Sequence, residues 1–176
     1  MDACPTFSGS VSVFASAAAT YFAPSDPSGV GGMHREHIRA TPSWRQGHPR
    51  YDCVFLNSRP ELDGMRALDV VRVLLFFSFT FEDVTYPCAL VRWFSVVGNE
   101  PDEDTGMWMV RPEVTDDGLP DISVIHLDCI VRAAHLLPVY GDNPIPRSIS
   151  LHNSLDAFAA FYVNKYVDHH AFEIAS

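Results

Sequence analysis

The sequence lacks a long apolar run and any closely spaced pair of cysteines. Its longest apolar stretch, residues 73–77, falls well short of the roughly 18 to 20 residues that cross a bilayer, so we expect no membrane span. The four cysteines include no C-x-x-C pair, which argues against a zinc knuckle or a disulfide scaffold. This usage is typical of a reducing compartment, and we expect a nuclear or cytoplasmic protein, although the cysteines alone do not exclude secretion.

Recognisable catalytic motifs are also lacking. There is no G-x-S-x-G nucleophile motif, and the glycines of residues 29–32 lack the Lys and Ser/Thr of a phosphate-binding loop. His34 and His37 have a spacing found in metal sites, but a surface or packing role is favoured in a chain with eight histidines. Metal-dependent nucleases hold carboxylates on rigid elements, and the best acidic cluster here, 102–104, lies in a loop. We therefore predict no catalytic residue, metal or cofactor.

Positive charge is scarce overall, with 12 basic against 22 acidic residues and a formal net charge of -10. A chain this acidic is repelled by nucleic acid unless its charges are segregated. Residues 33–50 carry four arginines against Glu36, a local balance of +3, whereas residues 99–121 carry eight acids against Arg111. Solvated loops would explain both clusters. The alternative is that the basic segment binds nucleic acid, and its candidate residues are Arg35, Arg39, Arg45 and Arg50.

Apolar side chains alternate with a period of two along residues 71–81 and return along residues 86–94, which predicts a β-hairpin. Further strands are expected at 11–22, 50–56, 106–110 and 122–127, and turn-rich segments separate them. Residues 128–137 are compatible with a strand or a short helix. The 11–19 segment faintly imitates a signal peptide, but no basic residue precedes it, and we interpret it as a strand. We predict a mostly β fold, a small barrel or bent sheet of five to six strands.

The C-terminal part has a helical pattern. Apolar residues between Leu155 and Tyr166 follow the i, i+3, i+4 spacing, and Ser154 is placed as the N-cap. We expect an amphipathic helix that packs on the barrel. The predicted organisation is a barrel-like domain over 1–147, followed by a helix and tail over 148–176 that pack on the same domain.

Aromatic residues on neighbouring strands, close to the acidic loop, form a second candidate site. Ring faces attract cations, so aromatics beside carboxylates can hold a methylated or free lysine or arginine side chain. Core filling is the alternative, because most such aromatics are buried. The candidate residues are Tyr86, Trp93, Phe94, Trp108, Asp102, Glu103 and Asp104.

Nearly the whole chain resembles the C-terminal part of transposases of Plavaka type, from fungal cut-and-paste DNA elements. The resemblance is most specific in the tail and extends through much of the chain; the similar segments are 22–36, 41–45, 50–55, 87–94, 102–108, 124–128, 132–136, 148–158 and 161–173. In that family the metal-binding catalytic core lies upstream of such a block. The resemblance therefore implies a detached C-terminal domain without catalytic residues. The strand order is also loosely similar to bromo-adjacent homology reader barrels, which is a fold-level analogy.

These observations leave several functions open. The leading expectation is a non-catalytic targeting module that binds a protein or chromatin partner, such as a histone tail. One alternative is DNA contact through residues 33–50, and another is a structural domain that docks on the transposase catalytic core through exposed aromatics of its tail. A metal-dependent nuclease is the least favoured.

Overall fold

The computed structural model describes residues 7–25, 29–141, 144–145, 147–150 and 152–176, and this part of the chain is mostly β. No helix within it is long and apolar enough to cross a membrane. Its strands are β1 (Ser12–Phe14), β2 (Ser16–Phe22), β3 (Met33–Thr41), β4 (Arg50–Tyr51), β5 (Cys53–Asn57), β6 (Leu68–Phe81), β7 (Val84–Val97), β8 (Met109–Pro112), β9 (Ile122–His126), β10 (Ile130–Ala134), β11 (Leu136–Pro138) and β12 (Phe161–Val163). Its helices are two 3-10 turns, η1 (Gly64–Ala67) and η2 (Leu127–Cys129), and two short α-helices, α1 (Ser154–Ala157) and α2 (His169–Ile174).

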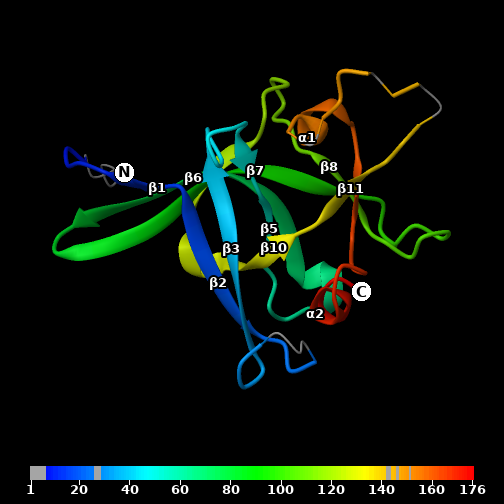
Figure 1. Ribbon diagram of the computed structural model, residues 1–176, viewed down its shortest axis with the longest axis horizontal. Coiled ribbons are helices and arrows are strands. Elements are labelled where there is room, and N and C mark those ends of the chain that lie inside the picture. The colour runs from blue at the N-terminus through cyan, green and yellow to red at the C-terminus, as the bar shows by residue number, and fades with distance from the viewer. Residues whose placement is uncertain (1–6, 26–28, 142–143, 146, 151) are drawn as a thin grey trace.

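The main sheet is nearly closed into a barrel (Figure 1). Its strands follow the order β10-β5-β6-β7-β8-β12-β11, with β1 added to β6 and β9 added to β7. The first and last strands of this order, β10 and β11, are separated in the chain only by His135. One continuous segment therefore contributes both edges, which explains how the sheet curls round on itself and protects edges that an open sheet would expose.

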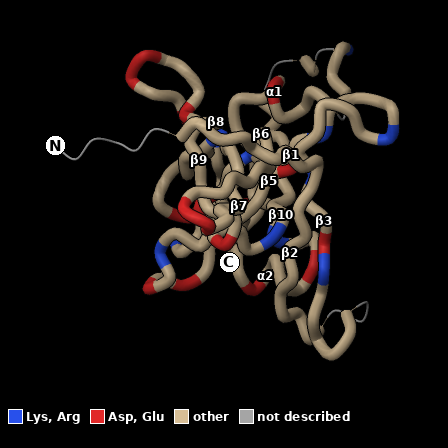
Figure 2. Tube along the Cα trace, turned by 90° about the vertical axis from the view of Figure 1, so that its left-hand side faces the viewer, with Lys and Arg blue, Asp and Glu red and all other residues tan. Residues whose placement is uncertain are grey.

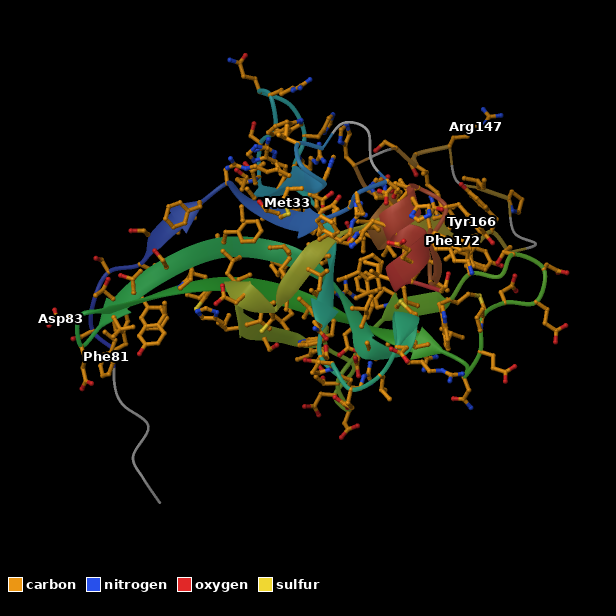
Figure 3. The ribbon with its side chains drawn as sticks, turned by 90° about the horizontal axis from the view of Figure 1, so that it is seen from below. Met33, Phe81, Asp83, Arg147, Tyr166 and Phe172 are labelled. Carbon is orange, nitrogen blue, oxygen red and sulfur yellow. The ribbon has the colours of Figure 1, made fainter. Side chains whose placement is uncertain are left out.

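A long hairpin of β6 and β7 projects from the barrel, and Figure 3 shows Phe81 and Asp83 at its end. Its two-residue turn is formed by Glu82 and Asp83, both with positive φ (49° and 62°). This conformation matches the twist of the flanking strands but usually selects Asn or Gly. The pairing of β6 with β7 has a register shift between Val73 and Leu75, an irregularity of the kind that bends a strand.

Two cores lie on opposite faces of the main sheet. The first lies inside the barrel and includes Phe55, Trp108 and Phe161, with Met65 of η1 packed in the same cluster. The second is the interface between the barrel wall and the small sheet β2-β3-β4. Because β5 contributes to both cores, its first four residues are all buried. A strand covered on both faces needs a continuous apolar run and not an alternating one.

The buried cation Arg132 fixes the C-terminal segment to the barrel. Its side chain is 2% exposed and makes two hydrogen bonds to the Asp168 carboxylate, at 2.8 and 2.7 Å. Glu36 lies 3.7 Å away, and the guanidinium lies over the Tyr21 ring at 4.6 Å. Asp168 also caps α2 by accepting from the Ala171 amide. One ionic network therefore joins β10, β3 and α2.

The mostly β, barrel-like architecture is confirmed, and so is the hairpin over 71–81 and 86–94. The predicted count of five to six strands was wrong, since the described residues contain twelve. Residues 128–137, which were ambiguous, form η2, β10 and β11, in keeping with the β-branched pair Ile130 and Val131. The 11–19 segment forms β1 and the start of β2.

The predicted amphipathic helix in the tail was wrong. Helix α1 has four residues, Phe158 after it is extended, and β12 then inserts into the main sheet between β8 and β11. The aromatic and β-branched residues Phe161, Tyr162 and Val163 suit a strand, and pairing with two neighbours supplies backbone hydrogen bonds along both edges. Residues 148–176 therefore include a strand of the barrel wall.

Candidate functional site

Three of the four arginines from the basic segment gather around one ring, that of Trp44. The guanidinium carbons of Arg39, Arg45 and Arg50 lie 4.4, 5.4 and 5.5 Å from its centre. We call these four residues the arginine cluster. The fourth predicted residue, Arg35, lies on the same outward face of β3 as Arg39, because alternate residues of a strand share a face. The structure thus brings the basic segment together.

The turn between β3 and β4 positions the arginine cluster. The amide of Trp44 donates to the carbonyl of His48 at 3.0 Å, and the amide of Gly47 donates back to the carbonyl of Trp44 at 2.9 Å. Between them, Arg45 and Gln46 have positive φ values of 50° and 61°. This unfavourable backbone makes the loop turn tightly, so that Arg45 and Arg50 lie near the same ring.

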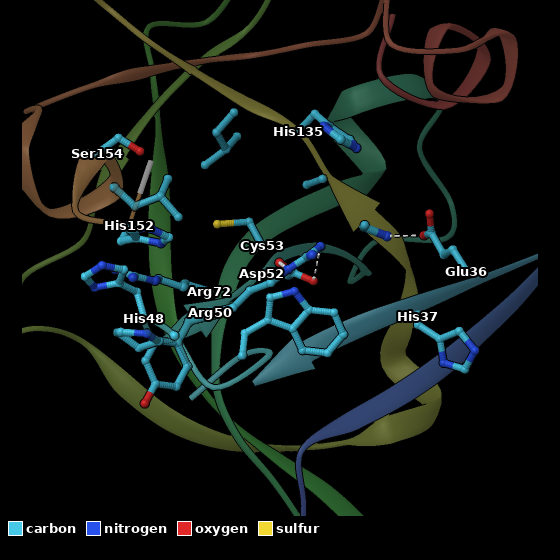
Figure 4. A pocket seen from close by; sticks show the side chains of 18 residues that line it. Glu36, His37, His48, Arg50, Asp52, Cys53, Arg72, His135, His152 and Ser154 are labelled. Carbon is cyan, nitrogen blue, oxygen red and sulfur yellow. Dashed lines mark hydrogen bonds and ion pairs between the residues drawn. The ribbon is translucent and has the colours of Figure 1, made fainter. Parts of the chain in front are cut away.

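A pocket of about 850 Å³ opens beside the arginine cluster and shares Trp44 and Arg50 with it. The volume is within the range of ligand pockets, about 300 to 1,000 Å³. Figure 4 shows His48, His152 and Arg72 along one side of the pocket and Glu36 and His37 on the other. The rings of His48 and His152 stack with centres 4.0 Å apart and an interplanar angle of 24°. The pocket therefore combines cationic groups with flat ring faces.

Arg72 of β6 is the most buried cation of the pocket, at 8% exposure. One of its terminal nitrogens donates to Asp156 Oδ1 at 2.6 Å, and its guanidinium lies 5.7 Å from the Tyr51 ring. Its Nε is buried and has no hydrogen-bond partner among the described residues. Because the guanidinium lines the pocket and carries only donors, it favours a ligand that offers acceptor atoms.

The carboxylates near the pocket are already engaged. Asp52 accepts two hydrogen bonds from the Arg50 guanidinium, at 2.8 and 3.2 Å, and one from the Arg39 amide. Glu36 accepts from the amide of Ala133. The thiol of Cys53 also lines the pocket, but burial raises its pKa to about 12, so it is protonated at neutral pH. Donors are thus the accessible chemistry of the pocket.

The predicted aromatic site is not assembled. Phe94 and Trp108 are 4% and 6% exposed and belong to the barrel interior. Trp93 packs against the other core and donates from Nε1 to Ser123 at 2.7 Å. Tyr86 stacks on Phe79 near the hairpin end, seven residues along β7 from Trp93, or about 24 Å at about 3.4 Å per residue. These rings therefore do not surround one ligand. Phe94 and Trp108 lie inside the barrel, Trp93 lies on the other face of the sheet, and Tyr86 lies near the hairpin end.

The acidic loop is a compact turn. Asp102 Oδ1 accepts from the amide and the hydroxyl of Thr105, at 2.9 and 2.7 Å, and these hydrogen bonds lower the pKa of Asp102. The backbone amide of Asp102 donates to the Met107 carbonyl, and Gly106 takes a positive φ of 66°. Asp102 thus stabilises its own loop, while Glu103 and Asp104 are exposed.

His34 and His37 lie on opposite faces of β3, because they are three positions apart on a strand of period two. His37 alone reaches the pocket.

The two charge clusters of the sequence lie in different parts of the fold. The acids of residues 99–121 are carried by the loops on either side of β8, whereas the basic residues are carried by β3, β4 and the loop between them. Figure 2 shows red segments in loops on several sides of the fold and both colours near β3. This segregation limits repulsion of an anionic ligand at the arginine cluster despite the net charge of -10.

Sequence reasoning missed Trp44, His48, Arg72 and His152. The only local signal was Trp44 beside Arg45 within the basic segment. Arg72 sits inside a strand that its apolar pattern defines, and His152 is 104 residues from the ring on which it stacks. No pattern along the chain links them.

Comparison with protein-family models, with curated proteins and with solved structures finds no match for this chain.

Proposed function

We propose that this chain is a non-catalytic binding module that contacts the phosphate backbone of a nucleic acid through the arginine cluster. The observation that carries the proposal is the gathering of Arg39, Arg45 and Arg50 around Trp44, which itself lines a pocket with Arg50 and Arg72. Guanidinium groups match phosphate oxygens in geometry and charge. The resemblance to transposase C-terminal parts supports a setting in which DNA is nearby.

Three cations of this surface are available to a ligand. Arg35, Arg39 and Arg45 have no ion pair within the part of the chain that the structure describes, whereas Arg50 is paired with Asp52. Three phosphate contacts predict a slope of log affinity against log salt of about -2.7 on duplex DNA, or about -2.1 on a single strand. Four contacts, including Arg50, would give about -3.6 on the duplex.

The test is fluorescence anisotropy with labelled single-stranded and duplex oligonucleotides, titrated at several salt concentrations. We expect binding at low salt with a slope near these values. The double variant Arg39→Ala/Arg45→Ala should make the slope less negative, by about 1.8 on duplex and about 1.4 on single-stranded DNA, or abolish binding. Arg111→Ala is the matched control, because it removes an exposed arginine from β8 on the acidic side. Absence of binding to either oligonucleotide at low salt would refute the proposal.

The other candidate roles have less support from the site. A histone-tail reader needs exposed ring faces, but Phe94 and Trp108 are buried. Docking on a catalytic core through the tail would use Phe158, Phe161 and Tyr162. Of these, Phe161 is fully buried in the barrel, and Phe158 and Tyr162 are partly buried.

A further inference from the structure

We infer that the pocket beside the arginine cluster receives one unstacked base of a single-stranded nucleic acid, and that it prefers guanine. This inference rests on the proposed function, which concerns only the phosphate backbone. It adds a ligand class, a reason for strand selectivity and a residue that reads the base.

The backbone site and the pocket are continuous. Trp44 and Arg50 belong to both, since each lies in the arginine cluster and each lines the pocket. A strand whose phosphates contact the arginine cluster would therefore bring its bases to the mouth of the pocket. A cavity of about 850 Å³ has room for a base and the water around it. Only an unpaired base can enter it, because a base inside a duplex is held by pairing and stacking.

Flat rings line the pocket. The stacked pair His48 and His152 and the Trp44 indole all contribute to the pocket wall. Proteins that bind single strands stack bases on such rings, and removing one stacking ring weakens binding about 5- to 150-fold. His152 precedes α1 and His48 belongs to the β3–β4 loop, so the pair joins segments that are 104 residues apart in the chain. Such a pair would form one ring platform for a base.

Arg72 supplies the base-reading chemistry. It is nine-tenths buried, lines the pocket and carries only donors, one of which is taken by Asp156. The base edge that it meets must therefore offer acceptors. Guanine presents two adjacent acceptors, O6 and N7, to which an arginine donates in a bidentate manner. The corresponding edges of adenine and cytosine include a donor amino group, which would oppose the guanidinium.

The experiment measures anisotropy of thymidine oligonucleotides that carry one central dG, dA, dC, dT or abasic site, with a duplex as comparison. We expect the strand with dG to bind about 5- to 150-fold more tightly than the abasic strand and more tightly than the duplex. His152→Ala should remove most of the advantage over the abasic strand without changing the salt slope. His126→Ala is the control, since it removes an exposed histidine from β9.

Arg72→Met tests the base preference, and its thermal denaturation is measured alongside because Arg72 is buried. A folded variant should bind the four bases equally. If it does not fold, His152→Ala and the base series on the unaltered protein still decide the inference.

Equal affinity for the dG and abasic strands, or for single strand and duplex, would overturn the inference and leave the proposed function standing. Equal affinity for all four bases would overturn the role of Arg72. Failure of every oligonucleotide to bind would refute the proposed function itself.

Discussion

Replacing Asp168 by Asn should destabilise the fold at neutral pH and leave it nearly unaffected in strong acid. The hydrogen bonds from Arg132 lower the pKa of Asp168 from 3.8 to about 2. At 1.36 kcal/mol per pKa unit, this shift corresponds to about 2.5 kcal/mol of stability. Because 37% of the Asp168 side chain is exposed, solvent screening reduces that value. We expect a loss of about 1 to 2 kcal/mol at pH 7.

The sign of the pH dependence follows from the lowered pKa. A carboxyl group whose pKa is depressed in the folded state stabilises the fold above its unfolded pKa, about 3.9, and this stabilisation is lost as the pH falls toward 2. The difference between the native protein and Asp168→Asn should therefore be constant from pH 7 to 8 and should shrink between pH 4 and 2. His170 and Glu36 also face Arg132. Burial lowers the pKa of His170 and the Asp168 charge opposes this, so the difference should rise slightly as His170 becomes protonated below pH 7.

Urea denaturation, followed by tryptophan fluorescence at each pH, provides the measurement. With a slope of about 2 kcal/mol per molar urea, the midpoint should fall by about 0.5 to 1 M at pH 7. Asn keeps an acceptor for the Ala171 amide, so Asp168→Ala should cost about 1 kcal/mol more through loss of the α2 cap. Asp128→Asn is the control, since that side chain is 88% exposed. A difference that does not shrink in acid would refute the argued role of the Arg132 pair.

Two further predictions concern the tail and the hairpin. Phe161→Ala should lower the free energy of unfolding by about 3 to 5 kcal/mol in a denaturant titration, because the ring is fully buried in the barrel. The control Phe172→Ala should lower it by under about 1 kcal/mol, because Phe172 is 45% exposed. Equal losses of stability in the two variants would contradict the placement of β12. Replacing Glu82-Asp83 by Asn-Gly should raise the stability by about 1 kcal/mol, since both positions have positive φ; a lower melting temperature would show that the turn conformation is not the one described.

The barrel could be predicted in outline because its strands obey local rules. The period-two pattern of 71–81 and 86–94 defines β6 and β7 in any context, since a hairpin needs only adjacent strands and a short turn. The tail could not be predicted in this way. Its apolar spacing fits a helix, yet β12 is a strand because β8 and β11 offer backbone partners on both of its edges. Those partners lie far away in the chain.

Of the two candidate sites that the sequence indicated, the structure assembles one and not the other. The basic segment 33–50 was visible as a run of arginines, and the structure gathers Arg39, Arg45 and Arg50 around Trp44. The aromatic site was an equally reasonable pattern, yet Phe94 and Trp108 are buried. Composition identifies a group of similar residues, but the position of each side chain on its strand decides whether it faces solvent or the core.

By itself, the sequence determined that the chain is mostly β, that it forms a long central hairpin and that its positive charge is concentrated in one segment. These properties depend on residues within about fifteen positions of each other, and period, turn chemistry and charge act at that range. Only the tertiary structure decided that β10 and β11 form both edges of the barrel and that Arg72 lies near His48 and His152. Strand pairing and pocket formation join distant segments, and the energy that selects them comes from burial and hydrogen bonds that exist only in the folded chain.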